Sequence, residues 1–446
     1  MNPEMLDAYF QSIADALPWW VLFVGACVGH GYLFIITLNV FYAWPLPHEL
    51  MKYTRKVDLL IVTAGPAIFA VALDLFGTNQ LSWQSGHWRA YLSGYTVICW
   101  IVGFGIAPIC EILYLLRRRA PQLVNETAET VDVAKELGYA PSGHGKDAKS
   151  CNLPLNQCFQ VEFTVKTLVL PQIPDAWDGL TILHLTDLHL CGTPDRAFFH
   201  YVMERCMKDG IPDLLLLTGD IVDSEWHHRW IVPVLGKLRW NLGAFAILGN
   251  HDSWRDVTLI RRRLRRVGMT VLGGSLTPSP SREGRGGIGW QQLDVRGEPM
   301  ILVGHEGPWF VPAPDLTKCP DKIFRLCLSH TPDNIEWGRK NQIDLMLAGH
   351  VHGGQIRLPV LGSVFVPSRY SRKFDCGTFY LAPTVLHVGR GLSGQHPLRF
   401  FCKPEVTRII LRKRGVRRPS EITSRIQKPI AGHLNSEGVP PQSPGS

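Results

Sequence analysis

Five short groups of polar residues carry side chains that bind divalent metal ions, and each group directly follows an apolar run. The groups are Thr186-Asp187-Leu188-His189, Gly219-Asp220-Ile221-Val222-Asp223, Gly249-Asn250-His251-Asp252, Ser329-His330-Thr331-Pro332-Asp333 and Gly349-His350-Val351-His352-Gly353-Gly354-Gln355. In an extended Asp-x-His, alternate side chains lie on one face, so Asp187 and His189 can hold one metal. His350 and His352 repeat this spacing. Carboxylate, amide and imidazole ligands suit Mn²⁺, Fe or Zn²⁺, so the sequence predicts a metal site built from distant parts of the chain.

The apolar runs before these groups predict the buried strands that would bring the groups together. The runs span residues 180–185, 214–217, 244–248, 324–328 and 345–348, and helical patterns span residues 194–209, 227–240 and 255–267. Residues 160–170 alternate in polarity like an edge strand. Strands that alternate with helices favour an α/β domain with two packed sheets, in which ligands gather at the carboxyl ends of the strands.

The first 116 residues hold the longest apolar runs of the chain and predict a membrane region. Three helical spans are expected, at about residues 18–44, 58–76 and 91–116. The first and last contain long stretches without Asp, Glu, Lys or Arg, which are sufficient for a span. The middle candidate contains Pro66 and Asp74, so an interfacial or re-entrant segment is the alternative there.

Basic residues set the expected orientation of this region. Three spans place the first connection, with Lys52, Arg55 and Lys56, on the same side of the membrane as the arginines at 117–119. The positive-inside rule makes that side cytoplasmic. We therefore expect a multi-pass protein of the cell membrane whose metal-binding domain is cytoplasmic. The alternative is a domain outside the cell, as in an envelope enzyme.

The chain of 446 residues divides into four parts by composition. They are a transmembrane region at 1–119, a linker without sustained periodicity at 120–160, the α/β domain with the metal-binding groups at 161–412 and a disordered basic tail at 413–446. The net charge of +8 comes partly from basic clusters beside the spans, which suit an anionic lipid surface better than nucleic acid. The 11 cysteines form no C-x-x-C pair and predict free thiols in a reducing compartment.

Taken in order, the five polar groups resemble the motifs of the calcineurin-like metallophosphoesterase superfamily, over about residues 161–412. Residues 347–359, together with residues 389–392, 397–399 and 404–405, are similar to the YkuE-like branch of membrane-associated phosphodiesterases. The resemblance implies a two-sheet α/β/β/α sandwich, two divalent metal ions and hydrolysis of phosphoric esters or pyrophosphates. The membrane region contributes nothing to this resemblance.

Carried over to this chain, the resemblance implies two neighbouring metal sites. The first ion would be held by Asp187, His189, Asp220 and His352, and the second by Asp220, Asn250, His330 and His350, with Asp220 as the bridge. The resemblance also implies that His251 is the general acid and that Asp252 orients it. A hydroxide that bridges two cations would attack phosphorus in line while His251 protonates the leaving oxygen.

Other polar residues near the motifs have structural interpretations as well as functional ones. Asp223 is expected to stabilise a loop rather than to bind metal, and His305 is expected to be structural. Arg357, Arg390 and Arg399 could either grip a substrate phosphate or pair with structural carboxylates.

We therefore expect a membrane-anchored phosphohydrolase whose substrate is itself in the bilayer, such as a phospholipid, a polyprenyl phosphate or a nucleotide-linked lipid pyrophosphate. By resemblance, superfamily enzymes that cleave UDP-diacylglucosamine are a precedent. One alternative keeps the metal site but gives it a soluble nucleotide or phosphoprotein substrate. Another is a non-catalytic membrane scaffold. A scaffold would be expected to have lost ligands, whereas every ligand position here carries the expected residue type. No nucleic-acid partner is expected.

Overall fold

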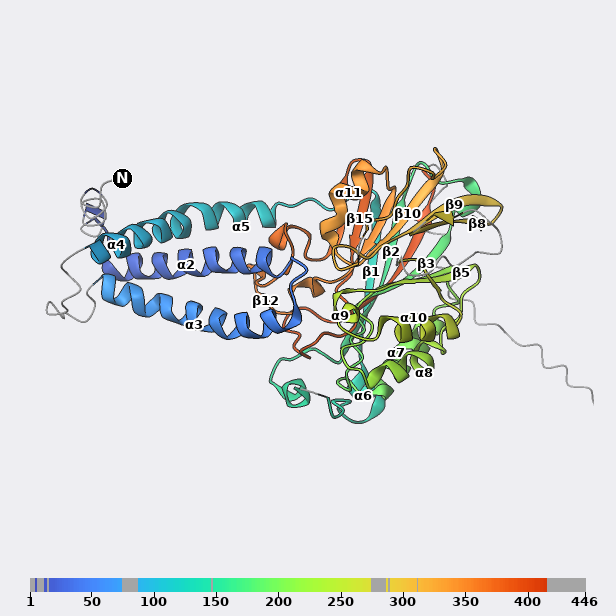
Figure 1. The fold of residues 1–446 in the computed structure, drawn as a ribbon, viewed down its shortest axis with the longest axis horizontal. Helices are drawn as coiled ribbons and strands as arrows, with labels where there is room; N and C mark the ends of the chain where they lie inside the picture. The colour runs from blue at the N-terminus through green and yellow to red at the C-terminus, as the bar shows by residue number, and fades with distance from the viewer. Residues whose placement is uncertain are drawn as a thin grey trace, which may run out of the picture.

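Two seven-stranded sheets and a bundle of long helices make up the computed structural model (Figure 1). It describes residues 5, 12–13, 16–73, 87–145, 147–273, 286–287, 289–310 and 312–414. Most of the tail predicted at 413–446 therefore lies outside the described residues, as does the end of the predicted middle span.

The first sheet has a parallel half that carries three of the five polar groups. In spatial order it contains β1 (Leu123–Asp132), β2 (Gln160–Val169), β16 (Glu405–Arg412), β3 (Leu180–Leu185), β4 (Leu214–Thr218), β5 (Gly243–Ile247) and β6 (Thr270–Val271). Strands β3 to β6 are parallel to one another. Every residue of β4 is buried, which explains its unbroken run of leucines, because a parallel strand is covered on both faces.

The second sheet supplies the other two groups. It contains β14 (Gly377–Leu381), β15 (Thr384–Val388), β11 (Leu345–Ala348), β10 (Phe324–Ser329), β9 (Glu298–His305), β8 (Trp290–Val295) and β7 (Gly286–Gly287). Strands β15, β11, β10 and β9 are parallel. Leucines of β4, β10 and β11 belong to one buried cluster, so the two sheets pack face to face.

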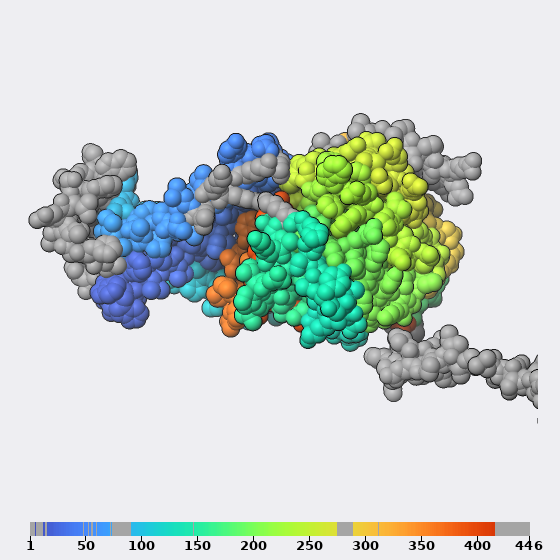
Figure 2. Space-filling view, turned by 90° about the horizontal axis from the view of Figure 1, so that it is seen from below, coloured from blue at the N-terminus to red at the C-terminus, as the bar shows by residue number. Residues whose placement is uncertain are grey.

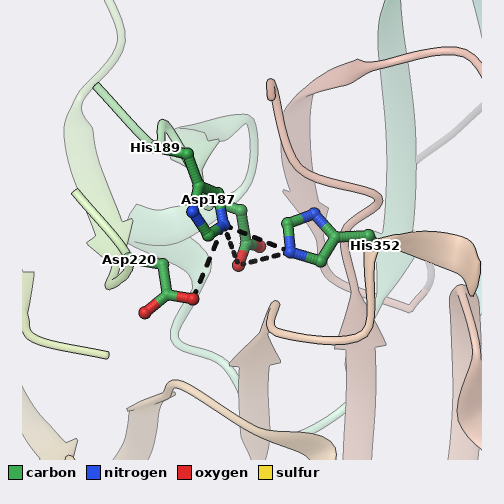
Figure 3. Close-up of side chains that lie close together, drawn as sticks. All are labelled: Asp187, His189, Asp220 and His352. Carbon is green, nitrogen blue, oxygen red and sulfur yellow. Dashed lines mark hydrogen bonds and ion pairs between the residues drawn. The ribbon is translucent and has the colours of Figure 1, made fainter. Parts of the chain in front are cut away.

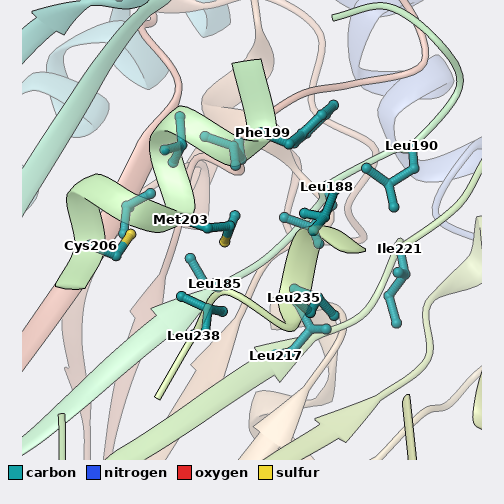
Figure 4. Close-up of a cluster of buried hydrophobic side chains, with 14 of the residues drawn as sticks. Leu185, Leu188, Leu190, Phe199, Met203, Cys206, Leu217, Ile221, Leu235 and Leu238 are labelled. Carbon is teal, nitrogen blue, oxygen red and sulfur yellow. The ribbon is translucent and has the colours of Figure 1, made fainter. Parts of the chain in front are cut away.

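Helices cover the outer faces of both sheets. On the first sheet lie α7 (Arg196–Lys208), α8 (Ile231–Leu235) and α10 (Val257–Arg266), and α11 (Ile335–Lys340) lies on the second. The side chains of Asp195 and Asp256 accept backbone N–H bonds at the starts of α7 and α10 and so fix where these helices begin. Figure 4 shows the core beneath α7, in which Phe199 and Met203 of the helix and Leu185 and Leu217 of the sheet belong to one buried cluster.

The five strands predicted before the polar groups are confirmed, and their observed bounds differ by at most one residue at either end. The helix predicted at 227–240 is shorter. A 3₁₀ turn at His227–Trp230 leads into α8, which ends at Leu235 before Gly236. Glycine has a low helix propensity, which accounts for the early end.

The segment at 120–160, which we expected to be a linker, instead begins with a strand. Strand β1 pairs antiparallel with β2, from Leu123 opposite Leu168 to Asp132 opposite Gln160. The predicted edge strand at 160–170 is therefore an interior strand. The polar sequence of β1 reflects its own position at the sheet edge, where most of its side chains are exposed. After β1 the segment forms α6 (Val133–Leu137), and Figure 2 shows it (teal) packed against the rest of the domain.

Long helices lie side by side and extend from one end of the sandwich (Figure 1). They are α2 (Trp19–Phe41), α3 (His48–Ala72) and a continuous helix made of α4 (His87–Trp100), a π-helical turn (Ile101–Ile106) and α5 (Ala107–Leu115). Close packing depends on glycine: a Cβ on Gly29 would lie 1.8 Å from the Cys99 carbonyl oxygen, and one on Gly103 would lie 2.1 Å from that of Gly25.

Two of these helices are long and apolar enough to cross a membrane, by length and composition. They are Trp19–Phe41 and Tyr91–Leu115. The apolar part of α3, Leu60–Val71, is shorter, so only two of the three expected spans meet this standard within the described residues.

Candidate metal centre and active site

All seven candidate metal ligands converge at the carboxyl ends of five strands. Asp187 and His189 follow β3, Asp220 follows β4, Asn250 follows β5, His330 follows β10, and His350 and His352 follow β11. Three strands belong to one sheet and two to the other, so the site forms only when the sandwich is assembled.

Asp187, His189, Asp220 and His352 form the first group, in which one ligand atom of each residue lies within 4.8 Å of the others (Figure 3). The Nε2 atom of His189 is 3.5 Å from Asp220 Oδ2 and 3.9 Å from Asp187 Oδ1. The Nε2 atom of His352 is 3.7 Å from the same Asp187 oxygen. Distances of this size leave room for an ion between the side chains, because metal–ligand bonds are about 2.0–2.2 Å.

A second group shares one residue with the first. Ligand atoms of Asp220, His330 and His350 also lie within 4.8 Å of one another. The Nε2 atom of His330 is 3.3 Å from Asp220 Oδ1 and 3.0 Å from Asn250 Oδ1, which adds an amide oxygen to the group. The two carboxylate oxygens of Asp220 thus face different groups, as a bridging ligand requires.

The backbone is strained where it presents these side chains. Asp187, His189, Asp220, His350 and His352 all have positive φ, between 45° and 71°. Such angles are uncommon outside glycine and cluster at functional sites. Neighbouring glycines permit the close approach, because a Cβ on Gly249 would lie 2.2 Å from Asp220 Oδ1.

The donor atoms of this centre fit divalent cations. His189 and His330 each donate an Nδ1–H bond, to Asp223 at 2.9 Å and to the Thr218 carbonyl oxygen at 2.7 Å, which aims each Nε2 at the centre. The Nε2 atom of His350 is buried and has no hydrogen-bond partner among the described residues. An imidazole nitrogen in that position is a ready metal ligand.

The carboxylates of this centre raise the pKa of two of its histidines. Burial lowers the pKa of His189, but Asp223 and the neighbouring carboxylates outweigh burial and raise this pKa to about 9. The pKa of His330 also rises to about 9, because Asp220 outweighs the effect of burial. Bound cations would displace these protons and neutralise the same carboxylates.

Comparison with known proteins identifies the family. The profile of the calcineurin-like phosphoesterase family matches residues 180–354, the stretch that contains all seven candidate ligands. The Bacillus subtilis protein named "Uncharacterized metallophosphoesterase YkuE" is 30% identical over 260 residues, which cover 56% of this chain and 86% of that protein. This chain belongs to the calcineurin-like phosphoesterase family.

Two further relatives have named activities. "Phosphodiesterase YaeI" of Escherichia coli is 32% identical over 244 residues, 52% of this chain and 81% of that protein. "UDP-2,3-diacylglucosamine pyrophosphatase LpxG" of Chlamydia muridarum is 28% identical over 279 residues, 51% of this chain and 82% of that protein. This chain is therefore a metal-dependent hydrolase of phosphoric esters that uses two divalent cations.

The carboxylate beside His251 in this phosphoesterase is Asp223. Its Oδ1 lies 2.6 Å from His251 Nδ1, and its Oδ2 accepts from His189 Nδ1. Burial raises the pKa of Asp223, but His189 and His251 outweigh burial and hold this pKa well below its usual range. Asp223 therefore links the first metal group to the expected general acid, and it does more than stabilise a loop.

Asp252 does not make the contact with His251 that we expected. Its carboxylate accepts backbone N–H bonds from Ile221, Val222 and Gly249 at 2.9–3.2 Å. It therefore fixes the loop after β4, and through that loop it positions Asp220. The two aspartates could not be distinguished in the sequence, because both lie close to the motif histidines.

The three arginines that could either bind phosphate or pair with structural carboxylates all have structural partners. Arg357 pairs with Asp375 at 2.8 Å, and Arg390 pairs with Glu405 at 3.0 Å. Arg399 is buried and donates to the carbonyl oxygen of His352 at 3.1 Å, so it supports a loop that carries a candidate ligand. His305 is buried and bonds to Asn334, in keeping with the structural role expected for it.

A cavity of about 380 Å³ connects the metal centre to the long helices. His251 and His350 line one part of it. Leu38 of α2, Tyr42 just after α2 and Met51 of α3 line another. No sequence motif identified these helix residues, since their contribution depends on how the helices meet the domain. A larger cavity of about 820 Å³ lies beside β1 and β14 and includes none of the candidate ligands.

Proposed function

We propose that this phosphoesterase is anchored in a membrane and cleaves a phosphodiester or pyrophosphate bond in a lipid-linked substrate. One observation carries the proposal: the cavity over the metal centre is walled partly by α2 and α3. A scissile phosphate at the metals would then have its apolar part beside helices that contact lipid. The relative named as a UDP-2,3-diacylglucosamine pyrophosphatase acts on a substrate of this chemical kind.

The proposed ligand sets follow the two side-chain groups. Asp187, His189, Asp220 and His352 would hold one ion, and Asp220, Asn250, His330 and His350 would hold the other. Two divalent cations bound there would neutralise phosphate charge and lower the pKa of water near the phosphorus atom.

The residues of the chain supply the remaining steps. Asp223 Oδ1 lies 2.6 Å from His251 Nδ1, so the other ring nitrogen, Nε2, points away from that carboxylate. Because His251 lines the cavity, its Nε2 is the atom that we expect to protonate the leaving oxygen. The apolar wall formed by Leu38, Met51 and Phe365 would exclude water from the substrate's lipid portion.

We also propose that α3 enters the membrane beside α2, which gives three spans and a cytoplasmic catalytic domain. The division into a membrane region at 1–119 and a catalytic domain ending near 412 belongs to the same proposal. Leu155 is 78% exposed on the domain, so a Leu155→Cys variant can report its side. If an impermeant maleimide labels this variant above the wild-type level in intact cells, the domain is extracellular and the orientation is wrong.

A substrate comparison tests the lipid assignment. With Mn²⁺, the full-length protein in vesicles should hydrolyse a lipid pyrophosphate with a kcat/KM at least tenfold above that for bis(p-nitrophenyl) phosphate. Leu38→Ala should lower the lipid activity by about tenfold, because it removes apolar surface from the cavity wall. Val40→Ala is the matched control, since Val40 lies nearby on α2 but outside this cavity, and it should preserve both activities. Equal effects of the two variants, or faster turnover of the soluble diester, would favour a soluble substrate instead.

A further inference from the structure

A second apolar groove lies on another face of α2, separate from the active-site cavity. The α2–α5 groove, of about 630 Å³, is lined by Val28, Gly31, Ile35 and Ile36 of α2 and by Leu113 and Tyr114 of α5. None of these residues lines the cavity over the metal centre. Both helices belong to the two candidate membrane spans, so the groove faces the bilayer if the protein is anchored as proposed.

The end of the groove next to the catalytic domain is cationic. Arg117, Arg372 and Lys373 line it with a single carboxylate, Glu111, which pairs with Arg372. Asp375 pairs with Arg117 at 2.5 Å from outside the groove. Lys373 is exposed, and its Nζ lies 5.1 Å from the centroid of the Phe374 ring. No carboxylate of the described residues forms an ion pair with Lys373, so an anion can approach its charge.

Gly31 gives the groove its depth at mid-length. A Cβ built on Gly31 would have no heavy atom of the described residues within 4 Å, in contrast with Gly25 and Gly29, where the helices touch. A long chain could therefore lie across this position without displacing either helix.

Exposed apolar side chains lie at the same end as the cations. Leu358 and Leu361 close the groove from the hairpin formed by β12 (Arg357–Leu358) and β13 (Gly362–Ser363), and they are 45% and 46% exposed. Val360, at the tip, is 78% exposed and has φ +68°, a conformation that is unfavourable for a β-branched residue. Contact with lipid would shield these side chains from water.

We propose that the α2–α5 groove binds an anionic phospholipid, with one acyl chain passing Gly31 and the phosphate beside Lys373. This inference rests on the membrane anchoring in the proposed function but not on its substrate. The excess of cations over carboxylates at the groove end favours an anionic headgroup over a zwitterionic one. The bound lipid would contact Arg372 and the β12–β13 hairpin, and so would join the helices to the catalytic domain.

Filling the groove with a side chain tests this site. The full-length protein should be purified in mild detergent, supplied with phosphatidylglycerol or phosphatidylcholine, and examined for retained lipid by native mass spectrometry. Gly31→Leu should lower phosphatidylglycerol retention by about tenfold, because it excludes chain methylenes from the groove. Gly105→Leu is the matched control: it also has open space at Cβ but lies outside the groove, and it should retain lipid like the wild type. Lys373→Gln should reduce the preference for phosphatidylglycerol.

Several outcomes would overturn the inference. Equal lipid retention by Gly31→Leu and the wild type would exclude the groove, and equal retention of both lipids by the wild type would exclude anionic selectivity. If Gly31→Leu does not fold, Ile35→Trp fills the same groove one turn further along and takes its place. A wild-type protein that leaves membranes in a salt or alkaline wash would contradict the anchoring itself. A membrane-retained protein that keeps no lipid would contradict only this inference.

Discussion

Asp220→Ala should lower kcat by about four orders of magnitude and reduce bound metal, because both candidate ion sites lose a ligand together. Each carboxylate oxygen of Asp220 faces a different group, and the His251 backbone N–H donates to Oδ1 at 2.9 Å. Removing the carboxylate also takes away the anion that lies 3.5 Å from His189 Nε2 and 3.3 Å from His330 Nε2. Hydrolysis of bis(p-nitrophenyl) phosphate and metal content by atomic emission would measure the two losses.

Asp213→Ala is the matched control for this variant. Asp213 is also a buried aspartate, but it precedes β4, where it accepts the Thr181 backbone N–H at 2.9 Å and pairs with Arg296. Its loss should lower thermal stability and leave the metal content per folded protein unchanged. If Asp220→Ala retained two metal ions and near-normal turnover, the shared-ligand assignment would be wrong.

The five strand ends could be predicted because each strand is a short run of apolar residues followed at once by polar ones. Parallel strands are covered on both faces, so β4 and β11 are continuous apolar runs with sharp ends. Strand β1 gave no such signal. It lies at a sheet edge, and its pairing with β2 is set by the tertiary structure rather than by its own pattern.

The candidate ligands could be named from the motifs, but their supporting contacts could not. Asp223 and Asp252 both lie within a few residues of the motif histidines, and the family resemblance implied Asp252 as the residue that orients His251. In the folded chain the loop after β4 crosses the start of α9 (Asn250–Ser253). This crossing presents Asp223 to the imidazole and turns Asp252 toward backbone N–H groups. The contribution of Leu38 and Met51 to the cavity likewise depends on long-range packing.

His251→Ala should lower kcat by about 10²–10⁴-fold while bound metal is retained, because the variant removes a proton donor rather than a ligand. The contact of residue 251 with Asp220 uses the backbone N–H, which alanine keeps. The variant loses only the imidazole and its contact with Asp223. The loss should be largest for an alkyl or phenyl ester and smallest for a p-nitrophenyl ester, whose oxygen leaves without protonation.

Comparing Asp223→Asn with His251→Ala separates proton donation by His251 from metal binding. Asp223 contacts Nδ1 of both His189 and His251, so its loss should weaken metal affinity as well as turnover, whereas His251→Ala should affect turnover alone. The decisive comparison is metal content. His189, Asp223 and His251 form a third cluster of possible ligands, so a His251→Ala protein that lost an ion would make His251 a ligand rather than the acid. A uniform rate loss across leaving groups would also exclude proton donation, because only a donor acts more strongly on the oxygen that most needs a proton.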